Sequence, residues 1–166
     1  QLDRALREDN AALAAQRRAL AQQHTWKNRQ EIIEAGLIEV TPKASIIIVT
    51  WHNLAMTKLC IESLLLNTNY LNYEIIVVDN HSNDGTPEYL RALAQQHSHI
   101  KIILNSTNYG FAKANNQGIE ISSGENIVLL NNDTIVPRGW LSRLLHHLGD
   151  PAIGIVGPMT NSIGNE

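Results

Sequence analysis

From residue 43 onward, short runs of branched apolar residues alternate with segments of helical periodicity. The expected strands cover residues 45–50, 73–78, 101–104 and 126–130, with a fifth at 152–156. The expected helices cover residues 54–66, 86–96, 110–121 and 137–148. Strands that alternate with helices of about ten to fifteen residues favour parallel pairing through right-handed crossovers. The alternation therefore predicts an α/β fold, a Rossmann-like and mostly parallel sheet with flanking helices.

The first 40 residues have a different composition and are expected to form a helical arm or linker. Residues 1–35 contain no Gly or Pro and are rich in Ala, Gln, Arg, Leu and Glu, which favours an N-terminal α-helix. Leu6, Leu13 and Leu20 recur every seven residues. A docked or linker helix and a dimerising helix both satisfy this pattern, and the former is favoured. Gly36 is expected to end the helix.

Net charge, cysteine content and hydropathy limit the partners, disulfides and membrane spans that the chain can have. The net charge of −3 gives no reason to expect a nucleic-acid partner. The single cysteine, Cys60, excludes an internal disulfide and reads as a buried structural thiol. No apolar run reaches the ~20 residues of a membrane span. We expect a cytoplasmic location, which includes the inner face of the membrane.

Polar residues follow four of the expected strands, at the point where each strand ends. The four clusters occupy residues 50–53, 79–85, 105–110 and 131–133. The carboxyl ends of parallel strands meet at one edge of a sheet, where ligands bind in folds of this class. Asn, Asp and Ser also make turns and cap helices, so each cluster alone has a structural explanation. Four clusters at one edge favour a binding site.

The residues after the first strand argue against two nucleotide-binding classes. No G-x-G-x-x-G follows that strand, so a dehydrogenase is not favoured. A nucleotidyltransferase would carry a Gly-rich, basic phosphate loop there, and Trp51-His52-Asn53-Leu54 is not one.

Five segments in order then resemble the family 2 glycosyltransferases of GT-A fold, from about Ala44 to Glu166. The segments are SIIIVTWHN at 45–53, VVDNHSNDGT at 77–86, NYGFAKANNQGI at 108–119, LLNNDTIVPRGW at 129–140 and GPMTN at 157–161. The resemblance implies that residues 43–166 are the nucleotide-sugar-binding part of such a domain. Because the chain begins with Gln and stops at Glu166, we expect it to be part of a longer protein.

The resemblance also assigns residues to the nucleotide. Asp79 is similar to the carboxylate that accepts a hydrogen bond from the base. Thr50 and Asn53 are expected to line the base and ribose pocket, and Trp51 either stacks on the ligand or packs internally. Asp84 is expected to make a turn and cap a helix first, with a ligand role second.

Other assignments concern the phosphates and a metal. The family carries Asp-x-Asp where this chain has Asn131-Asn132-Asp133, so Asp133 is the expected ligand of Mg²⁺ or Mn²⁺, with Asn132 as a helper. The segment from Asn108 to Asn116 is similar to the one that packs beside the donor phosphates and sugar, with Gly110, Asn115 and Asn116 as the expected site residues. Asn131 is also expected to bind the nucleotide sugar. A metal there would stabilise the leaving nucleoside diphosphate.

The implied activity is an inverting transfer of a sugar from a UDP- or dTDP-sugar to a glycan or lipid-linked acceptor. The loop sequences resemble the branch active in surface polysaccharide synthesis, rhamnosyl-type enzymes included. The general base is expected beyond Glu166, so turnover by this chain alone is in doubt. We expect a homo-oligomer or contact with a missing downstream segment. The alternative is a non-catalytic nucleotide-sugar-binding or helical assembly module.

Overall fold

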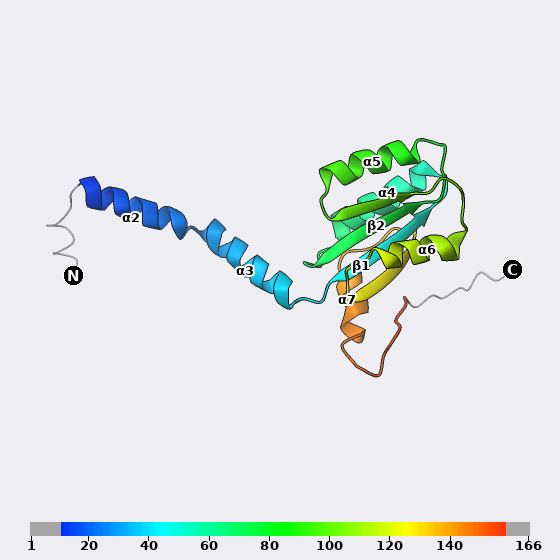
Figure 1. The fold of residues 1–166 in the computed structure, drawn as a ribbon. Coiled ribbons are helices and arrows are strands. Elements are labelled where there is room, and N and C mark those ends of the chain that lie inside the picture. Colours follow the sequence, from blue (N-terminus) through cyan, green and yellow to red (C-terminus); the bar gives the residue numbers. More distant parts are fainter. Residues whose placement is uncertain (1–10, 159–166) are drawn as a thin grey trace. The chain divides into compact units, whose positions relative to one another are not determined.

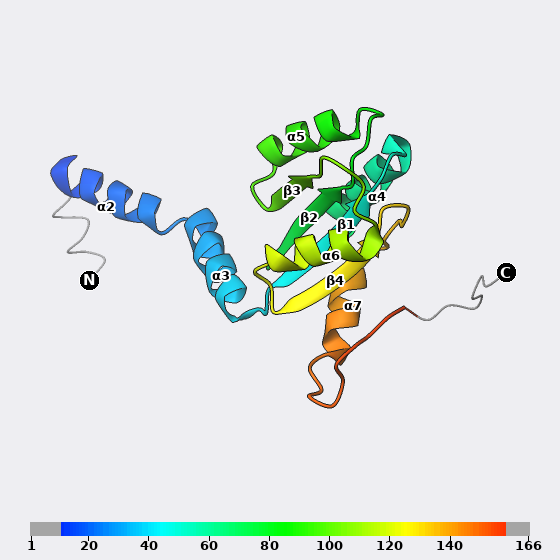
Figure 2. The same cartoon turned by 45° about the vertical axis from the view of Figure 1, so that its right-hand side comes forward.

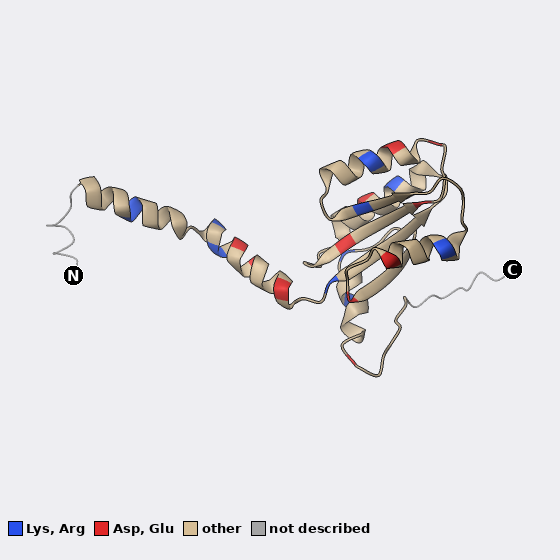
Figure 3. Ribbon diagram, in the orientation of Figure 1, with Lys and Arg blue, Asp and Glu red and all other residues tan. Residues whose placement is uncertain are grey.

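The computed structural model describes residues 11–158 of the chain and divides into two compact units, Gln1–Thr41 and Pro42–Glu166. Within the described part of the first unit lie α2 (Ala11–Gln23) and α3 (Trp26–Val40) (Figure 1). Lys and Arg occur in α2 and early in α3, and acidic residues occur later in α3 (Figure 3). Neither helix buries a side chain.

The expected end of the arm helix at Gly36 is wrong. The helix is interrupted earlier, at His24 and Thr25. The Thr25 hydroxyl accepts a hydrogen bond from the Asn28 amide at 3.2 Å and so caps the start of α3. Gly36 lies inside α3, which continues to Val40 and ends where the Thr41 amide donates to the Ile38 carbonyl. Leu6, the first member of the expected heptad series, lies outside the described residues.

The described part of the second unit is built on four parallel strands in the order β3-β2-β1-β4, which confirms the predicted α/β fold. The strands are β1 (Ala44–Thr50), β2 (Tyr73–Asp79), β3 (Ile100–Leu104) and β4 (Asn126–Asn131). Thr50 pairs with Asp79, and Val49 pairs with Asn131. The carboxyl ends of β1, β2 and β4 are therefore level within one residue.

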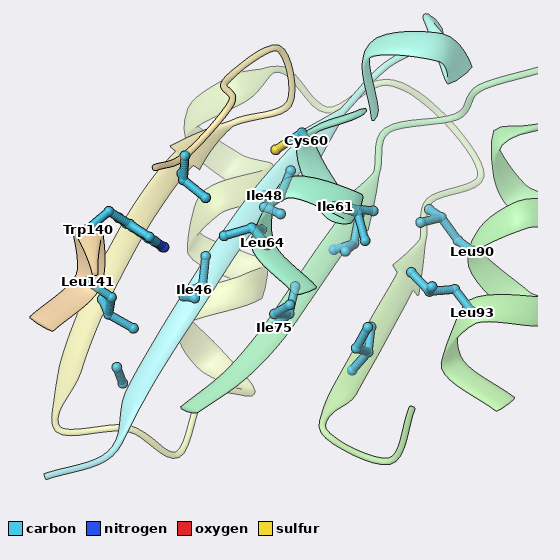
Figure 4. Close-up of a cluster of buried hydrophobic side chains, with 14 residues drawn as sticks. Ile46, Ile48, Cys60, Ile61, Leu64, Ile75, Leu90, Leu93, Trp140 and Leu141 are labelled. Atoms are coloured by element: carbon cyan, nitrogen blue, oxygen red, sulfur yellow. The ribbon is translucent and has the colours of Figure 1, made fainter. Parts of the chain in front are cut away.

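Four helices cover the two faces of this sheet in the described residues: α4 (Leu54–Asn67), α5 (Thr86–Gln96), α6 (Phe111–Glu120) and α7 (Trp140–His147) (Figure 2). Side chains of α4, α5 and α7 pack with Ile46 and Ile48 on one face (Figure 4). Ala114 of α6 packs with Ile47 on the other. Cys60 lies buried on the same face as Ile46 and Ile48, as predicted, and burial raises the pKa of its thiol to about 11.

Two expected elements differ in the structure. Residues 152–156 form no strand, because Gly154 and Gly157 leave only a short apolar run between them, and Ile155 is 92% exposed. The last helix begins at Trp140 rather than Pro137. Gly139 precedes it in a left-handed conformation, with φ of 72°, which separates Pro137 from the helix.

A buried carboxylate joins three strands at the opposite, amino-terminal edge of the sheet. Glu74, on β2, is 2% exposed and lies 2.9 Å from Lys101 Nζ and 3.3 Å from Lys43 Nζ. It also accepts hydrogen bonds from the Ser45 hydroxyl and from the amide and hydroxyl of Ser123. Burial alone would raise the pKa of Glu74, but these bonds outweigh it and lower the pKa to about 2.

Between residues 11 and 158, we find no helix with both the length and the apolar content that a membrane crossing needs.

Candidate donor-binding site at the carboxyl edge of the sheet

A hollow of about 380 Å³ opens at the carboxyl edge of the sheet. All four polar clusters that follow the strands contribute to its wall. The lining residues are Val49, Trp51, Asn80, Asn108, Gly110, Phe111, Asn131, Asn132 and Asp133. Strands β1 and β4 thus meet the start of α6 in one concave site, in which amide and carboxylate groups lie beside two aromatic side chains.

A larger groove of about 910 Å³ lies between β4, α7 and residues 154–158. Its lining is mainly aliphatic, with side chains such as Leu129, Ile135, Leu144 and Ile155. The smaller hollow therefore suits a polar ligand better, because its amide and carboxylate groups can satisfy that ligand's hydrogen bonds.

The loop after β4 is held to β1 and α4 by the side chain of Asn132. The Asn132 amide donates to the Thr57 hydroxyl at 3.1 Å and to the Thr50 hydroxyl at 3.3 Å. The two hydroxyls lie 2.8 Å apart. Asn131 and Asp133, on either side of Asn132, are exposed. Asn132 thus anchors the loop while its two neighbours face outward.

Asp133 is the charged residue of the hollow among the described residues that line it, and no Lys or Arg joins it there. The described residues also contain no group of three or more His, Cys, Asp or Glu side chains suited to a metal. The available donors are one carboxylate and neighbouring amide oxygens. Such a set fits Mg²⁺ or Mn²⁺ when substrate phosphates supply further oxygens, since these ions often take only one or two protein carboxylates.

Asp79 lies at the same edge as Asp133 but does not line the hollow. It is 1% exposed, and its Oδ2 accepts a hydrogen bond from the Ser82 amide at 3.1 Å. Its Oδ1 is buried without a hydrogen-bond partner among the described residues. A buried carboxylate oxygen without a donor is costly. Asp79 therefore has one buried acceptor whose hydrogen-bonding capacity is unused among the described residues.

The loops after β1 and β2 are tied together by side chains. The His52 amide donates to the Ser82 hydroxyl at 2.6 Å. Asp84 accepts from the Leu54 amide at 3.0 Å and from the Thr86 amide at 3.3 Å, and so caps the starts of both α4 and α5. The Thr86 hydroxyl donates to the same carboxylate at 2.6 Å. The Thr86 hydroxyl is the main cause that lowers the pKa of Asp84. The capping role expected of Asp84 is confirmed.

The loop from Asn105 to Gly110 is held by Asn80. This side chain is 2% exposed, although it forms part of the wall of the hollow. Its Nδ2 donates to Asn108 Oδ1 at 2.7 Å and to the Gly110 carbonyl at 3.3 Å. Its Oδ1 accepts from the Tyr109 amide at 3.0 Å and from Asn105 Nδ2 at 3.2 Å.

The structure brings half of the predicted site residues into one wall and leaves the others outside it. Trp51, Gly110, Asn131, Asn132 and Asp133 line the hollow, whereas the remaining five do not: Thr50, Asn53, Asp79, Asn115 and Asn116. The roles of these ten residues in ligand binding stay predictions.

Three of the five outside the wall are buried, and two of these, Thr50 and Asn115, use their side chains in hydrogen bonds elsewhere. The Thr50 hydroxyl serves Thr57 and Asn132, and the Asn115 amide donates to the Phe111 carbonyl at 2.9 Å. Asn53 and Asn116 are exposed to solvent and do not line the hollow.

Two lining residues, Val49 and Asn80, were not assigned from the sequence. Asn108 and Phe111 lie in the segment expected beside the donor phosphates but were not singled out within it. Asn80 and Asn108 belong to the polar clusters after β2 and β3, so their position at a strand end was the available signal. Phe111 lies in the expected segment but is not one of its polar residues. It lines the hollow because Gly110, with φ of 81°, starts α6 at that point.

The chain matches the family described as Glycosyl transferase family 2 over residues 45–166. It is 30% identical to the glycosyltransferase AglE of Haloferax volcanii over 70% of this chain. It is 29% identical to the GalNAc(5)-diNAcBac-PP-undecaprenol beta-1,3-glucosyltransferase of Campylobacter jejuni, again over 70% of this chain.

A solved structure is similar as well. The mannosyltransferase PcManGT of Pyrobaculum calidifontis, in complex with GDP-Man and Mn²⁺, superposes on 70% of this chain with a TM-score of 0.64 and 25% identity. The chain spans 38% of the length of each of the two relatives and 35% of the solved chain.

Proposed function

The chain belongs to glycosyl transferase family 2, and on that premise we propose that its hollow binds a nucleotide diphosphate sugar together with a divalent cation. The chain then supplies the donor-binding part of a sugar-transferring enzyme. The observation that carries the proposal is the position of Asp133 in a wall without Lys or Arg among the described lining residues. A diphosphate beside this carboxylate would be repelled unless a cation lay between them.

The nucleotide base is the natural partner of Asp79. A uracil, thymine or guanine base presents an N–H group that Asp79 Oδ1, which lacks a partner among the described residues, would accept. Trp51 is 57% exposed in the wall of the hollow and offers a flat face for stacking on the base or the sugar. We propose a UDP- or dTDP-sugar as the donor. A GDP-sugar is an outcome that the binding experiment below distinguishes.

The residues of the hollow have different roles in the proposed sugar transfer. Asp133 would hold Mg²⁺ or Mn²⁺ with the amide oxygens of Asn131 and Asn132 as helpers, while the Asn132 Nδ2 keeps their loop against Thr50 and Thr57. A bound divalent cation stabilises the charge that develops on the departing nucleoside diphosphate. The acceptor hydroxyl attacks the anomeric carbon from the opposite side and inverts its configuration. We assign its general base to no described residue.

The acceptor and the biological role are proposed from the relatives. The Campylobacter enzyme is named for a lipid-linked glycan on undecaprenol diphosphate. We propose a glycan or lipid-linked acceptor of the same kind, within surface polysaccharide synthesis at the inner face of the membrane. A rhamnosyl donor is the specific case that the loop sequences favour.

Isothermal titration of the full chain tests this proposal. UDP, dTDP and GDP are titrated with and without Mn²⁺ into the wild type, into Asp133→Ala and into Asp150→Ala, whose exposed carboxylate lies outside the hollow. We expect Mn²⁺-dependent binding of one nucleotide that Asp133→Ala removes and Asp150→Ala retains. A folded wild type that binds none of the three contradicts the proposal and favours the assembly-module alternative.

A further inference from the structure

Asn80 is a buried amide whose hydrogen-bonding capacity is fully used. An asparagine side chain offers two N–H donors and a carbonyl with two lone pairs. Both donors of Asn80 and both acceptor positions have partners in the loop from Asn105 to Gly110. No part of this amide is left to bind a ligand, even though the side chain forms part of the wall of the hollow.

The partners of Asn80 are themselves linked, and they form an amide network of Asn80, Asn105, Asn108 and Gln117. Asn105 exchanges two hydrogen bonds with Gln117 of α6, at 2.8 and 3.0 Å. The Asn108 carbonyl oxygen accepts from Asn80 and also from the Gly110 amide at 2.8 Å. The network thus joins the end of β2 to the loop after β3 and to the side of α6.

This network sets the position of one wall of the hollow. Asn108, Gly110 and Phe111 line the site, and Asn80 bonds directly to the first two. Another part of the lining, formed by Asn131 and Asp133, is fixed separately through Asn132. A change in the amide network should therefore move one wall while the metal-binding loop stays in place.

We infer that Asn80 is a positioning residue of the donor site, acting through the loop from Asn105 to Gly110 and the start of α6. The identity of the ligand in this inference rests on the function proposed above. The side chain fixes the distance between the Asn108–Phe111 wall and the Asp133 loop, and so determines how tightly the hollow holds a nucleotide.

The substitution Asn80→Asp tests this inference because it keeps the shape of the side chain, replaces both donors by an acceptor and adds one negative charge. A carboxylate still accepts from Tyr109 and Asn105, but it faces two acceptors, Asn108 Oδ1 and the Gly110 carbonyl. A flip of the Asn108 amide would relieve one of these contacts and lose the bond from the Gly110 amide. The matched control is Asn83→Asp, the same change at an exposed residue of the adjacent loop.

Two measurements separate positioning from general stability. We expect Asn80→Asp to weaken binding of the preferred nucleotide with Mn²⁺ by about tenfold or more, and to accelerate hydrogen exchange at the Gly110 amide by a similar factor. The amide of Leu54, which donates to Asp84 at the same edge, should keep its wild-type exchange rate. Asn83→Asp should match the wild type in all three.

Either of two results overturns the inference. One is wild-type affinity and wild-type exchange at Gly110 in Asn80→Asp; the other is equal acceleration at Gly110 and Leu54, which indicates a merely structural role. If Asn80→Asp does not fold, Asn105→Ala replaces it in the same measurements, because Asn105 bonds to Asn80 without lining the hollow. A wild type that binds no nucleotide defeats the proposed function, whereas the exchange comparison still decides the role of Asn80.

Discussion

At the scale of single residues, Asp79 carries a buried carboxylate oxygen that has no donor within the described chain. The substitution Asp79→Asn removes the charge and keeps the shape. We expect nucleotide binding to weaken by about 2 kcal/mol, the typical contribution of a hydrogen bond to a charged group. Thermal stability should change little, because the amide oxygen can still accept from the Ser82 amide and the other side-chain atom lacks a partner as in the wild type.

Titration calorimetry and thermal unfolding of the same Asp79→Asn preparation give both values. Unchanged nucleotide affinity would show that Asp79 does not contact the base.

Glu74 provides a second prediction at this scale. Its folded-state pKa of about 2 lies below its ordinary value of 4.5, so its stabilising effect is complete above pH 4.5 and is lost as the pH falls toward 2. The difference corresponds to about 3 kcal/mol at neutral pH. We expect Glu74→Gln to lower the free energy of unfolding by about this amount at pH 7.

The gap between wild type and Glu74→Gln should shrink below pH 4.5. Urea unfolding at a series of pH values measures it, with Glu120→Gln as the exposed control. A gap that stays constant down to pH 2.5 would rule out a charge-dependent role for Glu74.

At the scale of elements, the contact between α6 and the sheet depends on Gly118. A Cβ atom at this position would lie 2.5 Å from Ile47 Cγ2, and Ile47 is fully buried. We expect Gly118→Ala to cost about 1–3 kcal/mol of stability through overpacking. Because Gly110 and Phe111 begin the same helix, displacement of α6 should also weaken nucleotide binding.

The matched control for Gly118→Ala is Gly36→Ala. Gly36 also lies inside a helix, but nothing lies within 4 Å of its added Cβ. We expect this change to raise the helical signal in circular dichroism and to stabilise α3 by about 0.5–1 kcal/mol. Equal effects of the two substitutions would mean that α6 is not packed as tightly on Ile47 as described.

Helix α3 of the arm gains little stability from packing, unlike the helices on the sheet. Trp26, Ile33, Leu37 and Val40 recur on one side of α3, and each is at least 45% exposed. A 15-residue helix that buries no side chain gains little from packing and is marginal in water by propensity alone. Burial of this apolar side against a partner would therefore stabilise α3 more than any contact within the described part of the arm.

At the scale of the whole molecule, the sequence predicted the elements better than the contacts between them. The alternation of apolar runs and helical segments placed β1, β2, β3 and β4 within a residue or two, because buried parallel strands need continuous branched residues. The arm break at Thr25 and the late start of α7 were missed, since single capping and left-handed residues decide them.

The sequence predicted where the candidate site lies, but it did not predict the hydrogen bonds between the side chains of that site. Strand ends marked all four clusters, yet they did not distinguish Thr50, whose hydroxyl is buried, from Asn80, which reaches the hollow. That distinction depends on partners such as Asn108, 28 positions away along the chain. Such contacts arise from the packing of loops after the strands are in place, and local sequence patterns do not encode them.

The central claim is that the carboxyl edge of the sheet holds metal and nucleotide together. Paramagnetic broadening of backbone amide signals by substoichiometric Mn²⁺, with and without the preferred nucleotide, tests it most directly. We predict nucleotide-dependent broadening at Trp51, Gly110 and Asn131, and none at Glu74 on the opposite edge. Broadening that is centred elsewhere, or that is the same without nucleotide, would contradict the account.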